Sequence, residues 1–374
     1  METRRSSIGP ISGALILGVC AAAAAAHDDN DADDFRQQGY TNHVLTSDGN
    51  VQADFTDANL VNGWGVAFNP NGPVWVSDNG TGKSTLYDGT GKPQALVVTI
   101  PGVGGEHAAP TGIVFAGGND FVVSMPTATG TVSGPARFIF VTEGGTIAGW
   151  APNVNVTTAI TVPTPWTNAE YKGLALSGNG ATHLLYAADF RNNRVDVFDG
   201  TFKPVMKPGA FVDPFLPRGY APFGIQAIGG DVFVTYAKQD PAGGGDEVAG
   251  PGLGFVDIYT PDGKFVSRLA SRGALNAPWG VAQAPLSFGD FGGAILIGNF
   301  GDGTINAYDP RSGHFLGALR DQNQHRIRVD GLWGIAFGNG VSAQKTNSLF
   351  YAAGPNDEAN GAYGVIDPVA KRRW

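Results

Sequence analysis

The sequence predicts an all-β fold: a six-bladed β-propeller with four-stranded antiparallel blades, closed by an N-terminal strand. Three observations lead to this prediction. First, 56 glycines and 24 prolines in 374 residues leave little room for long helices. Second, one short pattern recurs six times, at intervals of 47–61 residues. Third, the last copy of the pattern lacks a strand, whereas an unassigned strand precedes the first copy.

Each repeat opens with a residue, usually bulky, that is followed by glycine and a short apolar run. The six openings are residues 64–68, 111–115, 172–176, 223–225, 279–282 and 333–337. A period of this length is typical of stacked supersecondary units that bury a core only against their neighbours. Loops of different lengths on a constant unit account for the uneven spacing.

A second apolar run follows each opening and does not alternate with polar residues. These runs are residues 74–76, 121–123, 184–186, 232–234, 294–297 and 349–351. A continuous apolar run of strand length indicates burial on both faces, as in a sheet packed between neighbouring sheets. We expect residues 194–197 and 304–307 to form half-exposed third strands, because they alternate. Residues 96–98 and 265–266 are candidate fourth strands.

The two ends of the repeat array predict how the ring closes. The sixth unit runs through residues 363–368, and the chain then ends without a fourth strand. Residues 42–46 precede the first repeat and belong to no repeat. We therefore expect this segment to pair with the last blade, which removes an open sheet edge.

The N-terminal residues 1–26 predict a signal peptide. Arg4 and Arg5 precede an apolar stretch at 11–20, and the alanines at 21–26 suit a signal peptidase. Simple cleavage is the favoured route, while Arg4–Arg5 leaves twin-arginine export open and Cys20 leaves a lipoprotein open. The protein is therefore expected in the periplasm or outside the cell.

Residues 27–39 are rich in aspartate and predict a disordered acidic tether, with a calcium-binding run as the alternative. Residues 40–370 form the single propeller domain, which we expect to be a monomer with no membrane span. The net charge of −9 argues against nucleic acid as a partner, because phosphate backbones are bound by basic surfaces.

Polar residues recur in the loops between second and third strands, which emerge on one face of a propeller. They include Asp78, Asn79, Asp189, Arg191 and Asn299. Such oxygen-bearing side chains can bind a ligand such as a sugar, and Asp78, Asp189 and Asn299 can hold a hard cation such as calcium. The alternative is that aspartate and asparagine cap tight turns through their own side chains.

Two further groups are candidate binding residues on the same face. Glu106 and His107 lie in a glycine-rich connection and offer a general base or a metal ligand. Trp64, Trp279 and Trp333 directly precede blade-opening glycines. They are either stacking platforms for a carbohydrate or wedges that pack near the central channel, and their position favours packing.

The segment from Gly63 to Asp78 resembles an NHL-type propeller blade, and the resemblance extends over residues 40–370. It points to an uncharacterised family of secreted bacterial six-bladed propellers. More distantly, the layout is similar to the gluconolactonase and senescence-marker family, whose propeller holds calcium in its channel. That family carries a metal-binding glutamate where this chain has Asn62–Gly63–Trp64.

The sequence contains no Gly-x-Ser-x-Gly elbow and no zinc-ligand spacing of histidines. The leading hypothesis is therefore an exported, non-catalytic propeller that binds a small molecule, a carbohydrate or a protein. The alternative is a calcium-dependent lactonase or hydrolase of the gluconolactonase type, with its site at the channel mouth. A structural protein of the cell envelope is the third possibility.

Overall fold

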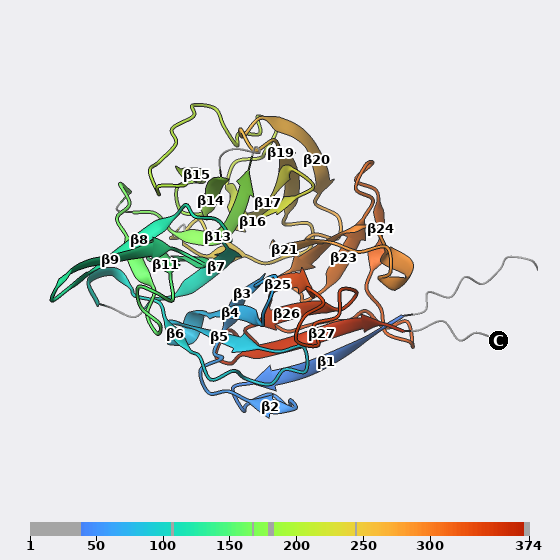
Figure 1. The fold of residues 1–374 in the computed structure, drawn as a ribbon. Coiled ribbons are helices and arrows are strands. Elements are labelled where there is room, and N and C mark those ends of the chain that lie inside the picture. Colours follow the sequence, from blue (N-terminus) through green and yellow to red (C-terminus); the bar gives the residue numbers. More distant parts are fainter. Residues whose placement is uncertain (1–38, 106–107, 167, 179–182, 244, 370–374) are drawn as a thin grey trace, which may run out of the picture. The chain divides into compact units, whose positions relative to one another are not determined.

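The computed structural model describes residues 39–105, 108–166, 168–178, 183–243 and 245–369. Over these residues, six antiparallel sheets follow one another around a central axis (Figure 1). The predicted signal peptide and all but the last residue of the predicted tether lie outside the described residues, as do Glu106 and His107. In the described part of the chain, no helix has the length and apolar character needed to cross a membrane.

Each sheet is a blade whose first strand lies nearest the axis. Blade 1 consists of β3 (Gly63–Phe68), β4 (Val74–Asp78), β5 (Lys83–Tyr87) and β6 (Val98–Thr99). Blade 2 consists of β7 (Pro110–Phe115), β10 (Phe138–Thr142), β11 (Ile147–Trp150) and β12 (Ile160–Val162). Blade 3 consists of β13 (Tyr171–Gly178), β14 (His183–Asp189) and β15 (Arg194–Asp199).

Blade 4 consists of β16 (Tyr220–Ile228), β17 (Asp231–Gln239), β19 (Phe255–Tyr259) and β20 (Phe265–Ser271), with β18 (Glu247–Val248) paired to β17. Blade 5 consists of β21 (Pro278–Gln283), β22 (Ile295–Asn299), β23 (Ile305–Tyr308) and β24 (Phe315–Ala318). Blade 6 consists of β25 (Leu332–Phe337), β26 (Leu349–Ala353), β27 (Ala362–Pro368), β1 (Tyr40–Ser47) and the short β2 (Phe55–Thr56). Three 3₁₀ turns, η1 (Asn79–Thr81), η2 (Val103–Gly105) and η3 (Gly289–Phe291), lie in connections.

The predicted closure of the ring is confirmed. Strand β1 pairs antiparallel with β27, with His43 opposite Val365 and Val44 opposite Gly364. A bulge between Val44 and Thr46 bends the strand before it continues opposite Tyr363. The N-terminal strand thus supplies the outer strand of the last blade, and β1 and β27 lie side by side in Figure 1.

The second strand of blade 2 was predicted wrongly at residues 121–123. Residues 122–127 form β8 (Val122–Thr127), which pairs only with β9 (Gly130–Pro135) in a separate hairpin. Along β8, most side chains are exposed or half-buried. The strand that pairs with β7 is β10, all five of whose residues are buried. The inserted hairpin places the true apolar run about 17 residues later than the pattern suggested.

Two further expectations fail for local reasons. Blade 3 has three strands rather than four. The chain after β15 forms an isolated bridge between Phe198 and Pro204 and a hydrogen bond from the Val205 N–H to Val197 O (2.8 Å), and the ladder does not continue, because proline donates no ladder hydrogen bond. The third strand of blade 5 is buried rather than half-exposed. Asn306 is 2% exposed, and its side-chain amide donates hydrogen bonds to Ala274 O (3.1 Å) and Thr304 Oγ1 (3.3 Å).

Six glycines set the spacing of the inner strands. They are the blade-opening residues Gly65, Gly112, Gly173, Gly224, Gly280 and Gly334. A Cβ atom built on any of them would come within 2.8 Å of the backbone of the next inner strand, with Gly334 reaching back to Trp64 O. The ring therefore closes at six points where backbone meets backbone, and each of these points excludes a side chain.

This close approach predicts a specific loss of stability. In Gly224→Ala, the added methyl group would overlap the carbonyl oxygen of Trp279. We expect the free energy of unfolding to fall by about 3 kcal/mol, the upper end of what overpacking costs. Denaturant unfolding measures this change.

Gly243→Ala is the matched control, because no described atom lies within 4 Å of its added Cβ. Equal stabilities of the two variants would contradict the close approach of the blades.

Candidate functional site

The residues before the blade-opening glycines lie around the central channel, where the four aromatic ones pack together. The six residues are Trp64, Thr111, Lys172, Phe223, Trp279 and Trp333. Thr111 donates its hydroxyl to Tyr171 O at 2.6 Å. The rings of Trp64 and Trp333 stack with centroids 3.5 Å apart, and the ring of Trp279 meets both edge-on. Trp64 and Trp333 are 2% and 1% exposed. We call this set the aromatic plug, because three tryptophans pack across the channel axis.

The structure therefore shows the sequence-identified tryptophans packed on one another. Phe300 stacks on Trp333 with centroids 4.1 Å apart, and Trp279 donates its indole N–H to Lys172 O at 3.0 Å. Trp279 and Phe300 are only partly buried, so part of each ring remains accessible.

Lys172 is the one charged residue among the six plug positions. Its side chain is 3% exposed, and its ammonium lies 2.5 Å from Glu143 Oε1 and 3.1 Å from Glu170 Oε1. Burial by itself lowers the pKa of Lys172, but the neighbouring carboxylates of Glu143 and Glu170 raise it by more than burial lowers it. The net effect is a raised pKa. Lys172 therefore stays protonated, and its charge also lies 5.4 Å over the ring of Trp64.

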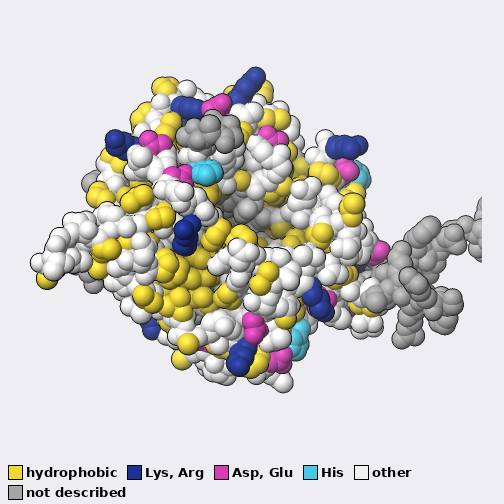
Figure 2. Space-filling view, in the orientation of Figure 1, with side chains coloured by type: hydrophobic (Ala, Val, Ile, Leu, Met, Phe, Trp, Pro, Cys, Tyr) yellow, Lys and Arg dark blue, Asp and Glu magenta, His cyan; other side chains and the backbone are white. Residues whose placement is uncertain are grey.

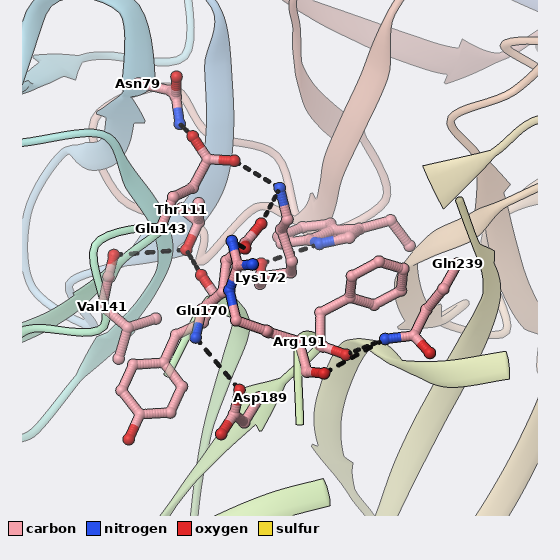
Figure 3. A network of polar contacts seen from close by, with 12 residues as sticks. Asn79, Thr111, Val141, Glu143, Glu170, Lys172, Asp189, Arg191 and Gln239 are labelled. Atoms are coloured by element: carbon pink, nitrogen blue, oxygen red, sulfur yellow. Dashed lines mark hydrogen bonds and ion pairs between the residues drawn. The ribbon is translucent and has the colours of Figure 1, made fainter. Parts of the chain in front are cut away.

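Polar contacts extend from Lys172 to neighbouring blades (Figure 3). Arg191, in the loop after β14, forms an ion pair with Glu170. Asn79, in the loop after β4, donates a hydrogen bond to Glu143 Oε2 at 3.1 Å. The network thus joins blades 1, 2 and 3 above the aromatic plug.

Two more carboxyl groups belong to the same electrostatic environment. Burial is the main cause that raises the pKa of Glu247 to about 7, while the charge of Lys172 lowers it. Burial and the charge of Glu143 raise the pKa of Glu358, and Lys172 again acts in the opposite direction. Among the described residues, neither carboxylate has a Lys, Arg or His nitrogen within 4.0 Å.

We name this end of the channel the polar mouth. It comprises Asn79, Glu143, Glu170, Lys172, Arg191, Glu247 and Glu358. Four carboxyl groups face two cations there, so the mouth has an excess of acidic groups. Asn79 and Arg191 are among the candidate binding residues named from the sequence, whereas Lys172, Glu143 and Glu247 are not.

The missed residues left two signals in the sequence. Lys172 occupies a position that four of the other five repeats fill with tryptophan or phenylalanine. Glu143 lies in the loop between β10 and β11, the loop equivalent to the one that carries Asp78 and Asn79 in blade 1. It was overlooked because the second strand of blade 2 was assigned to the wrong residues.

Asp78, Asp189 and Asn299 each make their hydrogen bonds close to their own loop. Asp189 Oδ1 accepts the backbone N–H of Glu170 at 3.1 Å, and Asn299 Oδ1 accepts the backbone N–H of Asn276 at 3.1 Å. Asp78 Oδ1 accepts from Thr85 Oγ1 at 3.2 Å. Through Asp189, the cap of blade 3 holds Glu170 in the polar mouth.

In the described part of the chain, no group of three or more His, Cys, Asp or Glu side chains is arranged to hold a metal ion. Asp189 and Asn299 cap blade connections through their side chains. Asp78 precedes η1 without a side-chain cap hydrogen bond, and its Oδ2 atom is buried without a hydrogen-bond partner among the described residues.

The buried ion pair of Lys172 predicts a large effect of its removal. Lys172→Met leaves Glu143 without its cation, and we expect the free energy of unfolding to fall by about 3 kcal/mol. This is the lower end of the usual range, because Glu143 is 31% exposed. Adding Glu143→Gln to Lys172→Met should recover part of the loss.

The control is Lys207→Met, which removes an exposed ion pair between Lys207 and Asp262. The Lys207 side chain is 41% exposed and the Asp262 side chain is 68% exposed. We expect it to cost less than about 1 kcal/mol in the same denaturation experiment. A similar loss for both lysines would show that the ion pairs of the polar mouth are not special.

Glu247 predicts a pH dependence of stability. Because its folded pKa of about 7 lies above the ordinary glutamate value of 4.5, the folded state binds the proton more tightly than the unfolded state. Its contribution to stability is thus full below about pH 4.5 and is lost as the pH rises through 7. We expect Glu247→Gln to be more stable than the wild type at pH 8, by up to about 3 kcal/mol.

Unfolding curves of both proteins from pH 4 to pH 8 test this expectation. Since other acids titrate equally in both proteins, the quantity to follow is the difference between them. A difference that does not change with pH would contradict the raised pKa of Glu247.

Comparisons with known proteins place the chain among propellers. No family model matches the sequence. Among solved structures, a protein of unknown function from Bacteroides thetaiotaomicron is similar with a TM-score of 0.53 at 13% identity, covering 88% of this chain and 76% of that one. The PQQ-bound aldose sugar dehydrogenase from Streptomyces coelicolor has a TM-score of 0.50 at 13% identity, covering 88% and 98%. At these identities the likeness shows the fold alone.

Sequence relatives come from Acanthamoeba polyphaga mimivirus. One uncharacterised protein is 32% identical over 331 residues, which cover 87% of this chain and 79% of the relative. A second is 33% identical over 331 residues, covering 87% and 84%. These relatives are viral, whereas the resemblance in the sequence pointed to a bacterial family. The chain belongs to the same family as these two mimivirus proteins.

Proposed function

We propose that the protein is an exported binding protein whose polar mouth takes a small organic cation. One observation carries this proposal: the carboxyl groups of Glu247 and Glu358 are half-buried near Lys172, and no Lys, Arg or His nitrogen of the described residues pairs with either. A partly buried carboxylate without a cationic partner is costly, and a ligand that brings a positive charge relieves that cost.

The surrounding groups support the same class of ligand. Lys172 and Arg191 are held by Glu143 and Glu170, so they fix the positions of these carboxylates. The partly buried rings of Trp279 and Phe300 add aromatic surface, which favours cations through their negative faces. A cationic amine or guanidinium with hydrogen-bond donors therefore fits the polar mouth better than an anion.

Export is part of the proposal and rests on residues 1–26. Their basic start, apolar stretch and alanine run have the order found in signal peptides. A protein that binds a cationic small molecule in the periplasm or outside the cell agrees with this segment.

The calcium-dependent lactonase has weaker support. Asp189 and Asn299 already accept hydrogen bonds from backbone N–H groups of their own blade connections. A calcium ion would have to replace these caps, which hold the start of the inner strands.

The test measures binding of named probes to the purified protein by calorimetry and by thermal melting. The probes are agmatine and choline as cations, D-glucose as a neutral polyol, and calcium chloride. We expect a cation to bind one to one and to raise the melting temperature, as a ligand of the folded state must. Its affinity should increase as the pH rises through 7, because Glu247 then loses its proton.

The double variant Glu247→Gln with Glu358→Gln should weaken cation binding at least about tenfold, the effect of losing about 1.4 kcal/mol. Asp262→Asn, which removes an exposed carboxylate on blade 4, should leave it unchanged. Failure of both cations to bind, or binding that survives the double variant, would refute the proposal. A rise in melting temperature with calcium alone would instead support the lactonase type.

A further inference from the structure

The opposite end of the channel is an open cavity of about 360 Å³. It is lined by the second halves of all six inner strands, β3, β7, β13, β16, β21 and β25. Figure 2 shows hydrophobic side chains gathered beside the centre of the ring, over β3 and β7. We call this cavity the apolar funnel.

The apolar funnel is blind. Val66, Ile113 and Ile335 line both the funnel and a deeper space of only about 30 Å³, which Trp279 also lines. A space of that volume holds about one water molecule. Beyond it, the stacked rings of Trp64 and Trp333 fill the channel, so the funnel does not continue to the polar mouth.

The lining of the funnel carries no charge. Of the described residues that line it, none is Asp, Glu, Lys, Arg or His. The side chains are Val, Ile, Leu, Phe and Ala, apart from the exposed Gln226 and Gln283. Polar atoms of the backbone and of the two glutamines make up about half of the exposed lining, so an occupant meets uncharged polar groups as well as apolar side chains. Concave cavities of about 300–1,000 Å³ that combine apolar side chains with uncharged polar groups are typical of small-molecule sites.

We propose that the apolar funnel is a second binding site, which takes the apolar body of an uncharged small molecule. The volume corresponds to about a dozen groups the size of a water molecule, so a fused ring or a short chain fits. The amides of Gln226 and Gln283 are placed to hydrogen-bond a hydroxyl or carbonyl group at the outer end of the ligand.

The shape decides between a small molecule and a protein partner. A stable protein interface buries about 800 Å² on each partner over a broad surface. The funnel instead offers a deep, blind opening surrounded by six strands, and only an extended projection of a protein enters such a space. The proposal is independent of the polar mouth, because the aromatic plug separates the two ends.

The experiment titrates the purified protein with 1-naphthalenemethanol, an uncharged alcohol on a fused aromatic ring, in a calorimeter. We expect one binding site, with an affinity that hardly changes between low and high salt, because no charge lines the funnel. Ala336→Trp fills the funnel from its wall, and we expect it to weaken binding at least about tenfold.

Gln283→Trp is the second variant, because it narrows the rim from an exposed position and leaves the core untouched. It should weaken binding as well. Val266→Trp is the control: Val266 lies on β20, is 50% exposed and does not line the funnel. Absence of a one-to-one complex, or affinities in Ala336→Trp and Gln283→Trp that equal the control, would overturn the proposal.

Discussion

The structure depends on the close approach of six inner strands around one axis. At each blade-opening glycine, the backbone of one strand reaches the backbone of the next, and the last glycine, Gly334, reaches the first strand at Trp64. Only a residue without a Cβ permits this distance. The approach fixes the diameter of the channel, and with it the side chains that fit inside.

The close approach of the inner strands also determines the role of the residue before each blade-opening glycine. Four of these six residues are aromatic and pack together in the plug. Lys172 introduces a charge into this apolar layer, which the fold tolerates because Glu143 and Glu170 come from loops directly above it. The polar mouth is therefore a consequence of one lysine at a position that the other repeats fill with an aromatic residue or with Thr111. The four glutamates of the polar mouth outnumber its two cations, Lys172 and Arg191.

The two ends of the channel differ because the inner strands differ along their length. Their first residues adjoin the blade connections and the loops after the second strands, which contribute carboxylates and amides. Their second halves contribute valine, isoleucine, leucine, phenylalanine and alanine side chains, together with Gln226 and Gln283, which line the apolar funnel. The plug divides the channel, so each end has its own chemistry.

The sequence alone determined the number of blades, the closing strand and the position of the tryptophans. The number of blades follows from a local pattern in the repeats, which have a glycine where two backbones meet and an apolar run buried on both faces. The closing strand follows from the last repeat, which lacked an outer strand, and from the segment around Val44, which belonged to no repeat. The inserted β8–β9 hairpin was misread because its apolar residues resemble a second strand locally, and only pairing with β7 distinguishes β10. The polar mouth was decided by the tertiary structure, since Glu143, Glu170, Glu247 and Glu358 come from four blades and meet only when the ring is closed. A local sequence pattern does not indicate which loops of distant repeats lie near the ammonium group of Lys172.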